Sequence, residues 1–86
     1  MPGGQLGGSV TVRYWAGARA AAGVDEDQVS GCPDVGAALA AVTTLRPALA
    51  AVVGACTLLL DGRAVSPTAA LGDDAVLEVL PPFAGG

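Results

Sequence analysis

The 86-residue chain contains no histidine and no lysine. Without histidine, it lacks the side chain that most often acts as a general base near neutral pH. Without lysine, it can form neither a Schiff base nor the lysine contact of a phosphate-binding loop. Catalysis would have to rely on carboxylates, arginine, serine or cysteine alone. We therefore do not expect the chain to be an enzyme by itself.

Positive charge is scarce in this sequence. Four arginines (Arg13, Arg19, Arg46 and Arg63) stand against eight acidic residues, which leaves a formal net charge of -4. This balance argues against binding to a phosphate backbone and favours partners with basic surfaces. We expect no nucleic-acid partner.

The sequence also lacks targeting and membrane signals. The start, "MPGGQLGGS", has neither the basic nor the apolar part of a signal peptide and predicts a flexible glycine-rich tail over residues 1–9. The uncharged run Pro47–Leu60 is shorter than the roughly 20 apolar residues that a membrane span needs. We expect a cytoplasmic protein with no membrane partner.

Cysteine is limited to Cys32 and Cys56. Their spacing fits no metal-binding pattern, and no histidine could complete a site, so we expect no bound metal. Both are interpreted as small, partly buried apolar residues. A disulfide, uncommon in the cytosol, and a reactive thiol at Cys32 ahead of a helix stay open as alternatives.

Apolar periodicity predicts one small domain over residues 10–80. Val10, Val12 and Tyr14 alternate with polar residues as in a strand with one buried face. A short alanine-rich helical turn closed by Gly23 follows, and then a polar strand whose charges suit a sheet edge. Asp34 is a good N-cap for the main helix. The apolar face of that helix is predicted to comprise Val35, Ala38, Leu39, Val42 and Leu45.

The second half of the chain predicts a hairpin and a central strand. The hairpin turns at Asp61-Gly62. The final strand, "AVLEVL", is apolar at almost every position, which is typical of the middle of a sheet. Leu77 and Val79 should face the core. The outer face of the sheet would then carry Val76, Leu80 and Leu59. These residues form either an apolar docking patch or single apolar residues of the kind that is common on protein surfaces.

The order of these elements predicts an α+β fold. The first and last strands can pair in parallel at the centre of a mixed sheet, with the main helix packed across one face. This arrangement resembles the ubiquitin-like β-grasp fold with an extended C-terminal tail over residues 81–86.

The tail "PPFAGG" carries no charged side chain. Pro81 and Pro82 cannot donate to a sheet and favour extended geometry. At about 3.3 Å per residue the tail could reach roughly 20 Å beyond the domain. Gly85 and Gly86 have no Cβ and could enter a channel only as wide as a backbone. The pattern fits either a frayed end or an arm that delivers its terminal carboxylate into another protein.

The segments "VTVRYWAGARAAAG", "LLLDGRAV" and "LGDDAVLEVLPPFAGG" resemble the MoaD/ThiS sulfur-carrier family. The resemblance covers nearly the whole chain, from Val10 to Gly86. Gly-Gly alone is a weak signal, but Gly-Gly after Pro-Pro, an "LGDDxV" loop and a strand is a specific one. The "RYWAGARAAAG" stretch favours the branch of molybdopterin synthase small subunits.

The resemblance implies a role for each part of the tail. An E1-like enzyme would use ATP to adenylate the Gly86 carboxylate, and a sulfur donor would convert it to a thiocarboxylate. The carrier itself would bind no cofactor. The tail would thread into the large subunit of molybdopterin synthase, in a heterotetramer, and give its sulfur to cyclic pyranopterin monophosphate. The threading residues would be Pro81, Pro82, Phe83, Ala84 and Gly85. A carrier for cysteine, thiamin or tRNA thiolation, a ubiquitin-like modifier, and a binding module with an inert tail are the alternatives.

Overall fold

The computed structural model describes residues 9–82, so residues 1–8 and Phe83–Gly86 lie outside the described part. The strands are β1 (Ser9–Tyr14), β2 (Glu26–Ser30), β3 (Thr57–Leu60), β4 (Arg63–Ala64) and β5 (Val76–Leu80). The helices are α1 (Ala16–Ala22) and α2 (Val35–Leu45), followed by 3₁₀ turns at Pro47–Ala51 and Val53–Ala55. Ser9, which we assigned to the N-terminal tail, is the first residue of β1 and pairs with Ser30.

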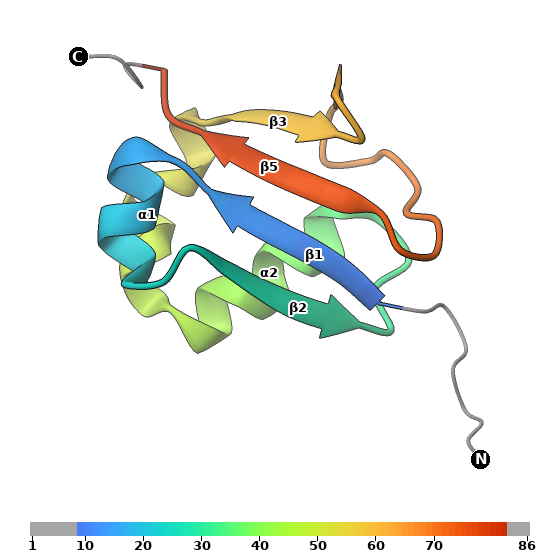
Figure 1. Cartoon of the computed structure of the whole chain (residues 1–86), viewed down its shortest axis with the longest axis horizontal. Coiled ribbons are helices and arrows are strands. Elements are labelled where there is room, and N and C mark those ends of the chain that lie inside the picture. The colour runs from blue at the N-terminus through green and yellow to red at the C-terminus, as the bar shows by residue number, and fades with distance from the viewer. Residues whose placement is uncertain (1–8, 83–86) are drawn as a thin grey trace.

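The strands form one sheet in the order β2-β1-β5-β3-β4. β1 and β5 run parallel at its centre, and the other neighbouring strands are antiparallel. In Figure 1, α2 lies behind the sheet, and α1 lies at the end of the sheet where β1 and β5 finish. The predicted central parallel pair, the polar edge strand and the α+β class are confirmed.

Local chemistry explains where the elements begin and end. The Asp34 carboxylate accepts the Ala37 backbone N–H at 2.8 Å and caps α2. Gly23 ends α1 with a left-handed φ of 81°. At the hairpin, Asp61 and Gly62 have φ values of 50° and 87°, as a two-residue turn between twisted strands requires.

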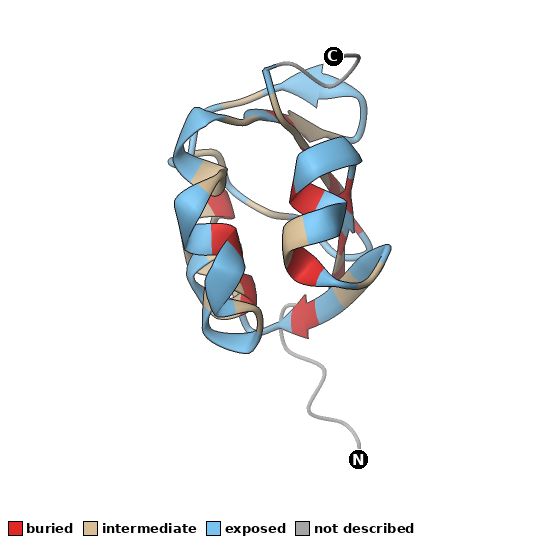
Figure 2. Ribbon diagram, turned by 90° about the vertical axis from the view of Figure 1, so that its left-hand side faces the viewer, coloured by how far each residue is buried: buried red, intermediate tan, exposed pale blue. Residues whose placement is uncertain are grey.

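The core lies between the sheet and the helices. Val12, Val35, Val42, Leu49 and Leu77 are completely buried. In Figure 2 the buried stretches of the helices face the interior, and exposed residues form their outer surface. The predicted inward direction of Leu77 and Val79 is confirmed, since they are 0% and 1% exposed.

The predicted apolar face of α2 was wrong at its end. Leu45 is 56% exposed, and Leu39 is only partly buried against the core. Because a helix turns about 100° per residue, both leucines fall at the margins of the stripe centred on Val35, Ala38 and Val42. The chain turns at Pro47, and Leu49 of the 3₁₀ turn reaches the core in place of Leu45.

Candidate functional site at the base of the C-terminal tail

The tail leaves the domain from the end of β5, next to α1 (Figure 1). The Trp15 backbone N–H donates to the Val79 carbonyl at 3.2 Å, which extends the pairing of β1 and β5 up to this point. A Cβ added to Gly17 would lie 3.9 Å from Pro81 Cγ, so the first tail residue packs close to α1. The base of the tail is therefore held by both β1 and α1.

Pro81 is partly buried and Pro82 is exposed. The other predicted tail residues, Phe83, Ala84, Gly85 and Gly86, lie outside the described residues. Proline has no N–H and cannot continue a sheet, which agrees with β5 ending at Leu80.

The predicted apolar patch lies on the sheet face opposite the helices. Val76 and Leu80 alternate along β5 with the buried Leu77 and Val79. Both are partly buried, as is Leu59, the third residue of the patch. Leu59 of β3 pairs in register with Glu78, which lies between Val76 and Leu80 on the same face. A carboxylate therefore interrupts the patch at its middle, a feature that the sequence analysis missed.

Glu78 is bonded to an exposed tryptophan. Trp15 Nε1 donates to Glu78 Oε2 at 3.2 Å, and the Trp15 residue is 42% exposed. Neither residue was predicted as a site. The two residues are 63 positions apart in the sequence. Only the expected parallel pairing of the first and last strands could have predicted that they lie close together.

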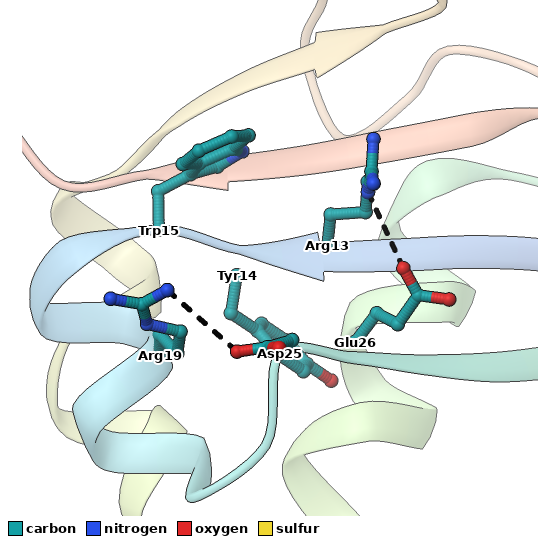
Figure 3. Close-up of a pocket in the computed structure, with 6 residues that line it drawn as sticks. All are labelled: Arg13, Tyr14, Trp15, Arg19, Asp25 and Glu26. Carbon is teal, nitrogen blue, oxygen red and sulfur yellow. Dashed lines mark ion pairs between the residues drawn. The ribbon is translucent and has the colours of Figure 1, made fainter.

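A hollow of about 230 Å³ opens beside this pair, at the junction of β1, α1 and β2. Its lining residues are Arg13, Tyr14, Trp15, Arg19, Asp25 and Glu26 (Figure 3). Arg13 pairs with Glu26 at 3.3 Å, and Arg19 pairs with Asp25 at 3.7 Å. Arg13 and Trp15 point to one side of β1, whereas Tyr14 points to the other (Figure 3).

A polar network joins strands to helix on the inner side. The Tyr14 hydroxyl donates to Asp27 at 2.8 Å, and Arg46 donates to both oxygens of Asp27 at 2.7 and 3.0 Å. These bonds from Arg46 hold the pKa of Asp27 below its ordinary value. Burial, reinforced by the bond to Asp27, raises the pKa of Tyr14. This network fastens the end of α2 to β1 and β2.

The two cysteines are Cys32 and Cys56. Both are free thiols and partly buried, as predicted, and burial raises the pKa of Cys56. Among residues 9–82, no three cysteine or carboxylate side chains are grouped so that they could hold a metal ion. Within the same range, no helix has the length and apolar content that crossing a membrane requires.

Comparison with known proteins decides the family. The model of the ThiS family matches residues 12–86. The chain belongs to the ThiS family. The family comprises ubiquitin-like sulfur carriers, which agrees with the resemblance inferred from the sequence motifs. The match extends through Gly86. No curated protein sequence matches the chain.

Solved structures agree with the fold of this ThiS-family chain. The small archaeal modifier protein 1 of Haloferax volcanii is 29% identical with a TM-score of 0.80, over 92% of this chain and 100% of that one. A protein described as molybdopterin converting factor subunit 1 from Pyrococcus furiosus is 26% identical with a TM-score of 0.78, over 88% and 99%.

A third structure is a complex of subunits 1 and 2 of molybdopterin-converting factor from Helicobacter pylori. It is 23% identical with a TM-score of 0.69, over 91% of this chain and 99% of that one. At this identity it supports the fold alone. Together the relatives confirm the β-grasp fold.

Proposed function

We propose that this ThiS-family chain carries sulfur as a C-terminal thiocarboxylate for molybdopterin synthesis. The observation that carries the proposal is the family match through Gly86, joined to a tail whose base is held between β1 and α1. When the base of a tail is fixed to its domain, the tail loses less conformational freedom on binding. This favours its insertion into one preformed groove.

In the proposed reaction, an oxygen of the Gly86 carboxylate attacks the α-phosphorus of ATP on an E1-like enzyme, and pyrophosphate leaves. A sulfur donor then attacks the acyl-adenylate carbonyl and displaces AMP, leaving sulfur in place of one carboxylate oxygen. The large synthase subunit receives the tail and supplies the catalytic groups for sulfur transfer to cyclic pyranopterin monophosphate. Because this chain has no histidine or lysine, its partner proteins would supply the acid–base groups.

The docking patch of Val76, Leu80 and Leu59 would support both partners in turn. It lies on the sheet face beside the tail base, so a partner that grips the tail can cover it at the same time. Partly exposed apolar side chains gathered on one face are a common basis for such contacts. In the Helicobacter pylori complex, a protein of this fold is bound to another subunit of molybdopterin-converting factor, which motivates the expectation of a synthase partner here.

A second candidate is a ubiquitin-like modifier. The Haloferax volcanii relative carries that word in its name and is 29% identical over its full length. Both functions begin with adenylation of Gly86, but they differ in the nucleophile. Sulfur yields a carrier, whereas a lysine amine of a target yields an amide bond. Sulfur carriage for cysteine, thiamin or tRNA thiolation is the remaining alternative.

Intact-mass spectrometry of the protein from its native host tests these functions. A mass gain that corresponds to one oxygen-for-sulfur exchange at Gly86, without conjugates, is the expected result. Conjugates of higher mass without any thiocarboxylate would establish the modifier instead. Supplying the thiocarboxylated chain with a large synthase subunit and cyclic pyranopterin monophosphate then identifies the pathway, because the other carriers would yield no molybdopterin.

A further inference from the structure

We propose that the Trp15 indole and the Glu78 carboxylate form a binding site for an arginine side chain of a partner protein. The site lies at the base of the tail, on the outer face of the sheet. That the partner is the protein receiving the tail rests on the proposed function, whereas the affinity of the pair for a guanidinium group does not.

A guanidinium group could contact the indole and the carboxylate of this pair at the same time. The exposed indole supplies an aromatic face, on which a planar cation can stack. Glu78 Oε2 accepts the indole N–H, which leaves Oε1 and further lone pairs for a second donor. The bond also holds the carboxylate at the edge of the ring. Arginine fits better than lysine because its flat fork can stack and donate at once.

The charges around the site favour a cation. The hollow and its rim contain three carboxylates, Asp25, Glu26 and Glu78, against two guanidinium groups. Arg13 and Arg19 are already paired with Glu26 and Asp25. No ion pair within residues 9–82 includes Glu78. The net charge of -4 adds a long-range preference for a basic partner.

The backbone keeps the indole in place. Tyr14 pairs with Val79 in the strand register, and the Trp15 backbone N–H donates to the Val79 carbonyl. Trp15 therefore lies beside the last residues of β5. Ala16 follows with φ of 46°, a left-handed conformation that is unfavourable for alanine. The chain thus turns sharply from β1 into α1 directly after Trp15, and the side chain is directed outward (Figure 3).

Arg13 is the nearest competing cation. Arg13 lies opposite Glu78 in the register of the parallel strands, and its side chain pairs with Glu26 at 3.3 Å. It points to the same side of β1 as Trp15 (Figure 3). An incoming arginine has to compete with it for the local carboxylates. Removing this competitor should therefore strengthen binding of an external guanidinium group, which a purely structural role of the pair would not predict.

Trp15 is the only tryptophan, so its indole N–H gives a single resonance that reports on the site. The full chain is titrated with N-acetyl-arginine methylamide, and with the citrulline analogue, which keeps the shape but lacks the charge. We expect the arginine compound to shift the indole resonance in a saturable manner and the citrulline compound to leave it nearly unchanged. Equal shifts with both compounds, or larger shifts with N-acetyl-glutamate methylamide, would overturn the proposal.

Variants assign the effect to individual residues. Glu78→Gln should weaken arginine binding about fivefold, the scale of one exposed ionic contact. Asp73→Asn removes the same charge from the loop before β5 and should change binding little. Arg13→Gln should strengthen it. If Asp73→Asn weakens binding as much as Glu78→Gln, only net charge matters and the site is refuted. The titration requires no tail chemistry, so its failure is distinct from failure to find a thiocarboxylate.

Discussion

The Tyr14 hydroxyl donates a 2.8 Å hydrogen bond to the Asp27 carboxylate, which also receives two bonds from Arg46. Tyr14 lies in β1, Asp27 in β2 and Arg46 at the end of α2. Through one carboxylate, the sheet edge is joined to the helix that covers it. The indole of Trp15, one residue further, points to the opposite face (Figure 3).

Asp27→Asn should lower the free energy of unfolding at neutral pH by about 1.5–3 kcal/mol, because charged hydrogen bonds to Tyr14 and Arg46 are weakened. The folded state lowers the pKa of Asp27 below its ordinary 3.8, so this stabilisation is present above pH 3.8. It should disappear as the pH falls through the lower value of the folded state. Urea unfolding of wild type and variant across this range measures the difference.

The exposed pair Arg19 and Asp25 provides the matched control for that experiment. Its atoms are 3.7 Å apart and both side chains are largely exposed. Asp25→Asn should therefore change stability little at any pH. A stability difference between wild type and Asp27→Asn that stays constant into acid would contradict the linkage to Asp27.

Leu49→Ala should destabilise the domain by about 2–5 kcal/mol, because Leu49 is completely buried and its removal leaves a cavity. Leu45→Ala makes the same chemical change at a residue that is 56% exposed and should stay within about 0.5 kcal/mol of wild type. Leu39→Ala should fall between them, since Leu39 is partly buried. Denaturant midpoints rank the three variants. Equal losses at Leu45 and Leu49 would mean that the core is misassigned.

Deletion of Gly86 should abolish sulfur transfer while leaving the denaturant midpoint unchanged. The core residues of the described structure end at Val79, so the deletion removes none of them. Molybdopterin formation by the purified synthase and the unfolding curve are measured on the same preparation. Continued molybdopterin formation by the truncated chain would show that Gly86 is not the sulfur-bearing residue.

Gly85→Val should prevent activation, because a branched side chain is placed where the proposed channel admits only backbone. Gly72→Val adds the same side chain at a glycine with no heavy atom within 4 Å of an added Cβ, and it should be activated normally. The rate of ATP-dependent adenylation by the E1-like enzyme compares the two. Normal adenylation of Gly85→Val would argue for a wide channel.

Most of the fold and the proposed working end could be predicted from the sequence. Alternation in β1, the Asp34 cap and the Asp61-Gly62 turn are local features, because they depend on neighbouring residues and backbone preferences. The tail motif likewise needs no tertiary context. These signals led to a central parallel pair of strands, a helix across one face and a carrier whose chemistry is at its end.

The tertiary structure alone decided which distant side chains meet. Periodicity places Leu45 on the apolar stripe of α2, but the turn at Pro47 brings Leu49 into the core instead. Trp15 and Glu78 meet across 63 positions, and Asp27 and Arg46 meet across 19. Such contacts depend on strand register, where a shift of one residue would move every side chain to the other face of the sheet. Register results from packing the whole core, so no local pattern could specify the pairing of the indole with its carboxylate.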